Sequence, residues 1–441
     1  MGWIRLFTRP LTLAITVAAG ACAREEPPAE PADVYWSDES LTAAQIEAGR
    51  RDSTWRQAVQ LDRRTTVVTA LDTLSIPEGW RDLAEAGEEA LQPTPIDETV
   101  HLPVFGDAEG PSVLYVQILL DRARFSPGVL DGKWGKNTEK AVAWFQDREG
   151  LPATGIVDSI TLARLRAQAG SPPALLGVRV LTEDDLAGPF VAIPSDVYRW
   201  RHLACMCYES PAEKLGERYH SSPVLLSELN GGRALDSLTP GDTLVVPHLR
   251  EEPVTAAVGD SVGPTDGPRI GRLVVSGRGF YVHALDEEGR LLFHFPITLG
   301  SSYDPSPAGE LEIVSITPDP WFHYQPRLLS GVDRSKPSTL VPPGPNNPVG
   351  GIWIKLSQPH YGIHGTREPA TIGYETSSGC VRLTNWDAAF LGARLATGMR
   401  VEFRDTRIDA APNGAWPPDS TPLARPEGGP QVGDETAGQR R

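Results

Sequence analysis

The chain has 441 residues and a formal net charge of −16. That length exceeds what one ordinary hydrophobic core supports, so we expect several domains. The negative charge argues against a sequence-independent hold on nucleic acid or on an anionic membrane surface. Nucleic acid is therefore not an expected partner.

The first 22 residues, "MGWIRLFTRPLTLAITVAAGAC", have the layout of a secretory signal. Arg5 and Arg9 precede an apolar stretch that is too short to span a membrane. The segment resembles a bacterial lipoprotein signal, in which the cysteine, here Cys22, becomes the acylated N-terminus. The resemblance implies a periplasmic protein with a lipid anchor, and Ala23 in place of Asp implies the outer membrane. The alternative is an ordinary signal that is cleaved after Ala-Gly-Ala.

Three further cysteines, Cys205, Cys207 and Cys380, leave at least one thiol unpaired. A bridge between Cys205 and Cys207 would close a very small ring, which we expect to be strained. No second Cys or His pair has a spacing that would complete a metal site. We therefore predict that Cys205 and Cys207 are buried or half-buried thiols.

Residues 23–111 read as a Pro- and acid-rich tether followed by a poorly defined helical region. From 112 to 168, apolar residues recur at helical spacing in three runs, and Asn137 and Asp158 are candidate helix caps. The runs Asp131–Thr138, Ala141–Gln146 and Gly155–Leu162 resemble a three-helix peptidoglycan-binding domain. The resemblance implies binding to the cell wall, and the alternative is a module that only spaces its neighbours.

Residues 200–250 resemble a LysM module, a small α+β unit that binds glycan strands through N-acetylglucosamine. The resemblance rests on two helix-like stretches, on Asn230-Gly231 and on the strand-like "LTPGDTLVVP". We expect its first strand within Val197–Tyr208.

From 269 to 404 the pattern changes to short β-rich runs separated by Gly, Pro and Asp turns. One helix is expected in "NWDAAFLGARLA", with Asn385 as its cap and Ala388, Leu391 and Leu395 on one face. Residues 405–441 are rich in Pro, Gly and charge, and we expect them to be disordered.

This β-rich region contains His364-Gly365 and, after a gap, Ser377-Ser378-Gly379-Cys380-Val381-Arg382. Neither His364 nor Cys380 alone would indicate a site. Together they suggest nucleophilic catalysis, because a thiol with a pKa near 8.5 needs a base such as imidazole at neutral pH. His360 and His364 lie four apart, but the segment reads as a strand without a neighbouring Glu, so no metal site is expected.

The motif resembles that of the L,D-transpeptidase (YkuD-like) catalytic domain, which implies a mainly β fold, a β-sandwich with a short helix. It implies Cys380 as nucleophile, His364 as base and Gly365 as the carbonyl that fixes the histidine tautomer. The backbone N–H groups of Gly379 and Cys380 are expected to stabilise an oxyanion. Four residues are expected to contact substrate: Arg382, Ser377, Ser378 and Tyr361. Ser378 stands where many members have a second histidine.

The resemblance implies acyl transfer from a tetrapeptide stem of peptidoglycan through a cysteine thioester, without a cofactor. The acceptor stays open between another stem, a wall protein, a D-amino acid and water, which would make the enzyme an L,D-carboxypeptidase. A non-catalytic wall-binding scaffold is the alternative from another class. We expect a fragment from Pro268 to Thr406 to retain acyl transfer on soluble peptides, with the upstream modules only concentrating substrate.

Overall fold

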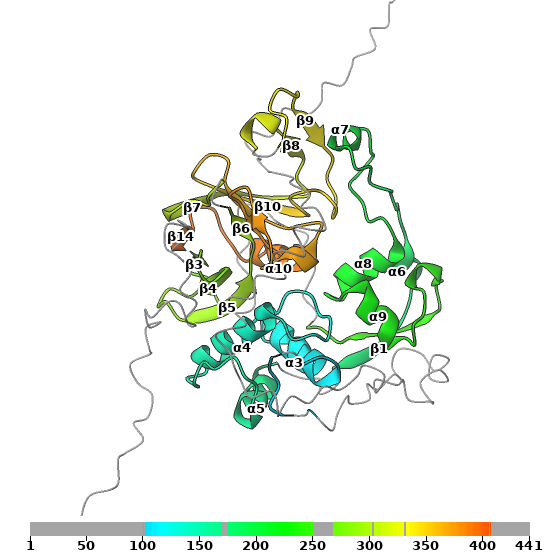
Figure 1. Cartoon of the computed structure of the whole chain (residues 1–441), viewed down its shortest axis with the longest axis vertical. Helices are drawn as coiled ribbons and strands as arrows, with labels where there is room; N and C mark the ends of the chain where they lie inside the picture. Colours follow the sequence, from blue (N-terminus) through cyan, green and yellow to red (C-terminus); the bar gives the residue numbers. More distant parts are fainter. Residues whose placement is uncertain are drawn as a thin grey trace, which may run out of the picture. The chain divides into compact units, whose positions relative to one another are not determined.

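The computed structural model describes residues 100, 102–106, 108–169, 175–250, 268–301, 304–329, 332–404 and 406 (Figure 1). These residues all belong to one compact unit. The expected signal with Cys22, residues 23–99, and the tail apart from Thr406 lie outside the described residues. Within the described part of the chain, no helix is both long and apolar enough to cross a membrane.

The predicted three-helix domain is formed by α3 (Pro111–Arg122), α4 (Lys136–Arg148) and α5 (Ser159–Gln168). The apolar positions predicted to share helix faces are buried in a common cluster. Asp158 caps α5 by accepting a hydrogen bond from the Thr161 N–H, as predicted. The prediction for Asn137 was wrong: Gly135 is the N-cap of α4, and the Asn137 amide donates instead to the Ile372 carbonyl at 2.8 Å.

The second module contains two antiparallel strands, β1 (Leu176–Val180) and β2 (Thr243–Pro247), with helices between them. The helices are α6 (Glu183–Leu186), α7 (Val197–Trp200), α8 (Pro211–Arg218), α9 (Pro223–Leu229) and η5 (Leu235–Ser237). The strand that pairs with β2 therefore starts at residue 176, so the second module begins before its predicted first residue, 200. Residues 187–210, here called the inserted segment, occupy the stretch in which that strand was expected.

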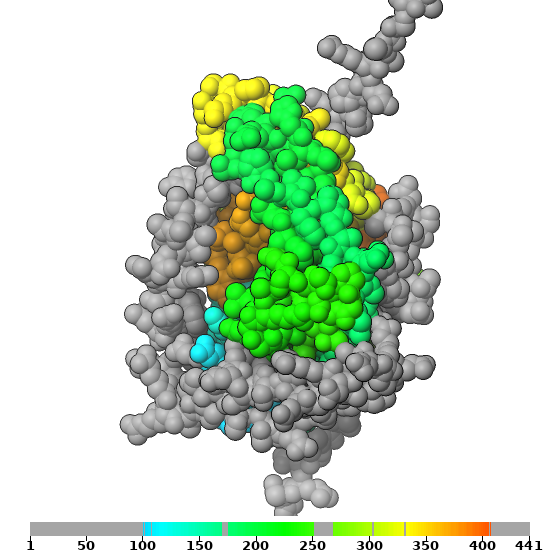
Figure 2. All heavy atoms as spheres, turned by 90° about the vertical axis from the view of Figure 1, so that its right-hand side faces the viewer, coloured from blue at the N-terminus to red at the C-terminus, as the bar shows by residue number. Residues whose placement is uncertain are grey.

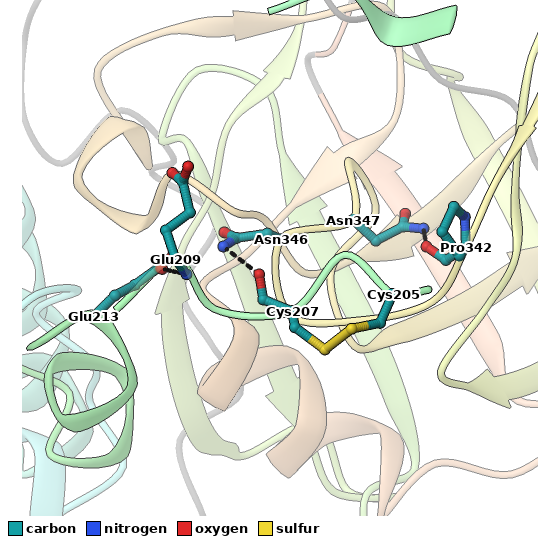
Figure 3. The surroundings of a disulfide bond; sticks show 7 residues. All are labelled: Cys205, Cys207, Glu209, Glu213, Pro342, Asn346 and Asn347. Carbon is teal, nitrogen blue, oxygen red and sulfur yellow. Dashed lines mark hydrogen bonds between the residues drawn. A yellow bond between two sulfur atoms is a disulfide. The ribbon is translucent and has the colours of Figure 1, made fainter. Parts of the chain in front are cut away.

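The prediction that Cys205 and Cys207 are thiols was wrong, because they form a disulfide bond (Figure 3). Their side chains flank Met206 on an extended segment, and alternation places positions i and i+2 on the same side. The Cα atoms are 5.1 Å apart, within the usual range for a disulfide. Met206 exchanges backbone hydrogen bonds with Pro343 and Asn346, which holds the segment in this conformation.

The C-terminal β-rich region forms an eight-stranded sheet of order β13-β11-β10-β7-β14-β3-β4-β5. The strands are β3 (Arg272–Ser276), β4 (Tyr281–Leu285), β5 (Leu291–Pro296), β7 (Gly309–Pro318), β10 (Ile352–Leu356), β11 (Gly362–His364), β13 (Val381–Arg382) and β14 (Arg400–Arg404). Each β-rich run predicted from the sequence contains a strand. The expected sandwich of two sheets is replaced by one sheet, because the long β7 pairs with β14 in its first half and with β10 in its second half.

Smaller elements complete this region. They are β6 (Leu299–Gly300), β8 (Phe322–Tyr324), η6 (Pro326–Leu328), β9 (Thr339–Val341), η7 (Pro369–Thr371), β12 (Thr376–Ser377) and α10 (Asn385–Gly392). Ala388, Leu391 and Leu395 are buried as predicted, and they pack with strands from both halves of the sheet. The cap of α10 is Thr384 rather than Asn385, because the Thr384 hydroxyl accepts the Asp387 N–H.

The three-helix domain covers the edge strand β5. Phe125 forms an isolated parallel β-bridge with His294 of β5. The Ser126 N–H donates to the His294 carbonyl, and the His294 N–H donates to the Arg124 carbonyl. Side chains from β3, β4 and β5 join the apolar cluster of the helices. Covering an edge strand removes unpaired backbone groups that would otherwise attract another strand.

Candidate active site

The two residues of the predicted catalytic pair are brought together by strands β11 and β13. These strands pair in parallel, with Ile363 opposite Val381 and His364 opposite Arg382. Cys380 directly precedes β13. Because side chains alternate along a strand, Cys380 and Arg382 point to the same face as His364. The pairing thus places Cys380 and His364, sixteen positions apart in the sequence, on neighbouring strands and on the same face.

The ring of His364 is fully buried and its orientation is fixed from two directions. Its Nδ1 lies 2.6 Å from the Gly365 carbonyl oxygen. A carbonyl can only accept, so Nδ1 carries the proton and Nε2 of the neutral ring has a lone pair that can accept one. Trp353, which lies opposite His364 in β10, stacks on the ring with the centroids 5.4 Å apart.

Burial, reinforced by the positive charge of Arg382, lowers the pKa of His364 to about 3, against the opposing effect of the Gly365 hydrogen bond. The ring is therefore neutral at physiological pH. A neutral imidazole in this tautomer is the form that acts as a general base.

Cys380 remains a thiol and is only 3% exposed. Burial raises its pKa to about 12, although a backbone hydrogen bond from Gly362 and the charge of Arg382 act in the opposite direction. The thiol lies 3.6 Å from the His360 carbonyl oxygen. In this closed arrangement the pair is a neutral thiol beside a neutral imidazole, so attack requires transfer of the thiol proton to the base.

The turn before Cys380 is held by Ser377. The Ser377 hydroxyl donates to the Cys380 carbonyl at 2.6 Å and accepts the Gly379 N–H at 3.2 Å. In this structure the Gly379 N–H is used within the turn, and its contact with an oxyanion stays a prediction. Ser377 is buried and shapes the turn, and its contact with substrate stays a prediction.

A glycine is required at position 379. Its φ is +107°, and a Cβ there would lie 2.7 Å from Cε1 of Tyr361. Tyr361 is half-buried and donates from its hydroxyl to the Pro305 carbonyl at 3.2 Å. Ser306, a residue not singled out in the sequence, donates to the Gly379 carbonyl at 2.9 Å.

The remaining predicted substrate residues lie beside the pair. Arg382 is buried, exchanges two backbone hydrogen bonds with Thr298, and its charge lowers the pKa of His364 and opposes the rise in that of Cys380. Ser378 is half-buried in the turn. Their contact with a substrate carboxylate or stem peptide stays a prediction.

Cys380 also belongs to an apolar cluster that the sequence motif does not predict. It joins Trp353 to Phe322, Tyr324 and Val341 of the β8–β9 hairpin and to Trp200 and Met206 of the inserted segment. Tyr324 of this hairpin is buried, whereas Trp321, directly before β8, is 40% exposed. Figure 1 shows α7 beside β9, and Figure 2 shows green atoms of the second module against yellow atoms of the hairpin.

Among the residues that the structure describes, no group of three or more His, Cys, Asp or Glu side chains could hold a metal ion. His360, the second histidine near the site, is exposed, and its positive φ of 75° places it in a turn before Tyr361.

Comparisons with known proteins agree with this geometry. Residues 271–403 match the L,D-transpeptidase catalytic domain, and residues 109–165 match a putative peptidoglycan binding domain. A putative L,D-transpeptidase YkuD of Bacillus licheniformis is 28% identical over 189 residues, covering 43% of this chain and 90% of that protein. A probable L,D-transpeptidase YbiS of Escherichia coli is 42% identical over 71 residues, covering 16% of this chain and 23% of that protein.

Solved structures give weaker likenesses. An L,D-transpeptidase from Xylanimonas cellulosilytica (residues 123–326) aligns with a TM-score of 0.28 at 15% identity, covering 70% of this chain and all of that one. An L,D-transpeptidase from Mycobacterium smegmatis aligns with a TM-score of 0.26 at 17% identity, and this chain spans only 59% of its length. On the matches of residues 271–403 and 109–165, the chain contains a catalytic domain of the L,D-transpeptidase (YkuD) family, preceded by a putative peptidoglycan-binding domain.

Proposed function

We propose that this protein is a cysteine L,D-transpeptidase that acts on the tetrapeptide stems of peptidoglycan. The observation that carries the proposal is the arrangement of the pair. His364 is held as the Nδ1–H tautomer by Gly365, and the β11–β13 pairing brings Cys380 to the same face of the sheet. A fixed base beside a thiol is the arrangement that nucleophilic acyl transfer requires.

In the first half-reaction, His364 Nε2 takes the thiol proton of Cys380 as sulfur attacks the carbonyl of the L-centre of diaminopimelate. The bond to D-Ala breaks, and His364 returns the proton to the leaving amine. The products are free D-Ala and a thioester on Cys380. Because Nδ1 stays bonded to Gly365, the ring can exchange protons at Nε2 without turning.

In the second half-reaction, an amine attacks the thioester and His364 accepts its proton, which then passes to the leaving sulfur. The new amide is a 3–3 cross-link if the amine belongs to another stem, or a bond to a wall protein. Water in place of the amine would give a carboxypeptidase. Cys380 is buried within the apolar cluster, which limits the access of water and of an amine alike, so product analysis decides the acceptor.

The test uses the full chain with tetrapeptide muropeptides, followed by mass spectrometry with and without an added amine. Wild type should release D-Ala, and His364→Ala should lower kcat by about 10²–10⁴-fold. Cys380→Ala is the blank. Release no greater than in that blank would sink the proposal, and hydrolysis that is unaffected by added amine would assign the carboxypeptidase reaction instead.

Slow alkylation of Cys380 would not by itself show that the protein is a non-catalytic wall-binding scaffold. Burial raises the pKa of this thiol to about 12, so slow reaction at neutral pH is expected of the closed enzyme as well. The substrate assay is therefore the measurement that separates an enzyme from a wall-binding scaffold.

The proposal places the protein in the periplasm, anchored through Cys22 to the outer membrane, with peptidoglycan as its partner. The charged and apolar pattern of the first 22 residues supports the location. The match of residues 109–165 supports wall binding, and the antiparallel pairing of β1 with β2, with α8 and α9 between them in the chain, supports a LysM-like role for the second module.

A further inference from the structure

The amide of Asn385 contacts the loop that orients the catalytic histidine. Its Oδ1 accepts the Thr366 N–H at 3.0 Å. Thr366 follows Gly365, whose carbonyl oxygen holds His364 Nδ1 at 2.6 Å. Asn385 thus fixes the backbone on one side of the carbonyl that fixes the tautomer of His364.

Two glycines make room for this amide. A Cβ at Gly365 would lie 2.1 Å from Asn385 Oδ1, and a Cβ at Gly350 would lie 2.0 Å from the same atom. Such distances do not occur between real atoms, so the absence of side chains at both positions allows the amide to lie against the Gly365 backbone. The contact is buried, and Asn385 itself is 7% exposed.

The other end of the amide is held by the second module. Asn385 Nδ2 donates to Glu217 Oε2 at 2.8 Å and to the Pro345 carbonyl at 3.1 Å. Glu217 belongs to α8, and its second oxygen accepts from the Tyr208 hydroxyl at 2.9 Å. Next to this contact, the ring of His220 stacks on Trp386 with the centroids 4.9 Å apart.

We propose that Glu217, contributed by the second module, is a positioning residue for the catalytic base. It acts through Asn385, then the Thr366 N–H and the Gly365 carbonyl, on His364. The inference rests on the proposed function, and it assigns to an upstream module a part in the catalytic step itself. Glu217 does not touch substrate in this scheme.

The physical reason is the polarity of the amide. An amide can bind in two orientations that differ by exchange of oxygen and nitrogen. In the observed one, Nδ2 faces two acceptors and Oδ1 faces a backbone donor. The reverse would direct Oδ1 at the Glu217 carboxylate and Nδ2 at the Thr366 N–H, so the carboxylate disfavours it. Without Glu217, the amide would keep only the Pro345 carbonyl and the Thr366 N–H to select its orientation, with one acceptor lost on the Nδ2 side.

The first measurement is kcat and KM on a soluble tetrapeptide, using the full chain. Glu217→Ala should lower kcat by about 10-fold, with KM within about twofold, because misplacement of a catalytic group acts on the chemical step. Glu217→Gln keeps an acceptor oxygen and should retain at least half of the wild-type kcat. Glu228→Ala is the matched control, since Glu228 is an exposed residue of the same module and the variant makes the same charge change.

The second measurement is the rate at which iodoacetamide modifies Cys380 between pH 6 and 9, read by mass spectrometry of the Cys380 peptide. This rate depends on His364 but not on the peptide substrate. Glu217→Ala should shift the profile toward that of His364→Ala, whereas Glu228→Ala should follow wild type.

The outcomes separate the two proposals. If wild type releases no D-Ala, the proposed function fails while the alkylation profile still tests Glu217. An alkylation profile of Glu217→Ala that matches Glu228→Ala overturns the positioning role. So does a loss in Glu217→Gln as large as in Glu217→Ala, or a change in KM alone, because either would indicate a merely structural or binding role.

Discussion

The two upstream modules contact the catalytic domain in different ways. The three-helix domain shares one apolar cluster with β3, β4 and β5, at the far end of the strand order from the catalytic strands β11 and β13. The second module also contributes Leu176, Leu225 and Val245 to this cluster, but it has a leucine-rich core of its own as well. It reaches the site through Glu217 of α8 and through the inserted segment, whose Trp200 and Met206 share a cluster with Cys380.

This difference indicates a division of roles that the sequence did not suggest. A shared apolar core makes the three-helix domain part of what keeps the catalytic domain folded. The second module adds contacts near the thiol to its share of that core, so changes at these contacts can alter catalysis without disturbing the shared cluster. A fragment of residues 268–406 would expose both the edge strand β5 and Cys380. We therefore expect this fragment to be less stable than the full chain, which bears on the prediction that it acts alone.

The largest expected effect concerns the shared core. Phe125 is fully buried, packs edge-on against Phe145 and lies beside His294 of β5. Phe125→Ala should lower the free energy of unfolding by about 3–5 kcal/mol, since it leaves a cavity between the domains. Chemical denaturation of the full chain measures this, with Ile160→Ala, at a 58% exposed site, as control. A loss no larger than that of the control would show that the domains fold independently.

The sequence predicted the elements of the site because its chemistry is local. The spacing of His364, Gly365 and Cys380 identifies a strand pair and a turn, and the structure has both. Helices α3, α4 and α5 were equally readable from their apolar spacing.

What could not be predicted depends on contacts between distant segments. Nothing near Glu217 in sequence indicates that its carboxylate meets Asn385, 168 positions away. The expected caps Asn137 and Asn385 failed for the same reason, since both amides are used in contacts between domains. The Cys205–Cys207 bridge depends on an extended backbone that residues 343–346 impose.

The second effect is a loss of stability in acid at the same interface. The rings of His283 and His294 are buried, with His283 Nε2 at 3.0 Å from His294 Nδ1. The ring of Trp144 in α4 packs edge-on against that of His283. Burial lowers the pKa of His294 to about 3 and that of His283 well below its usual value, and the charges of Lys140 and Arg404 act in the same direction. Unfolding therefore takes up protons below about pH 6.5. Stability is full above that pH and falls as pH decreases toward 3.

Thermal unfolding between pH 7 and 4 measures this slope. His294→Phe, which cannot take up a proton, should flatten it, whereas His202→Gln, at an exposed site, should not change it. An unchanged slope in His294→Phe would mean that the histidine pair does not contribute to acid sensitivity.

The third effect tests the cover over the thiol. Trp200 is 2% exposed in the cluster with Cys380, and the Arg367 guanidinium lies 5.3 Å from its ring centroid. Trp200→Ala should raise the rate of Cys380 alkylation at pH 8 by roughly 10-fold, which corresponds to about 1.4 kcal/mol in the free energy of opening. The unfolding of the three-helix core should not change. Val224→Ala, at a 65% exposed site of the second module, is the control, and equal rates in the two variants would mean that Trp200 has no special part in the cover.

The smallest effect concerns a polar contact of the three-helix domain. Asn137 donates to the Ile372 carbonyl at 2.8 Å, and a Cβ at Gly373 would lie 2.3 Å from its Oδ1. The loop held in this way joins His364 to Cys380. Asn137→Ala should lower the free energy of unfolding by about 1 kcal/mol, the net value of one buried hydrogen bond. It should change kcat by less than about twofold, because the Thr298 hydroxyl also holds this loop by accepting the Gly373 N–H. Gln168→Ala, which removes an exposed amide from α5 of the same domain, controls for the loss of a helical amide. A loss in kcat as large as that of Glu217→Ala, without a matching loss of stability, would show that the three-helix domain also positions the site, and the contrast between the two modules would no longer hold.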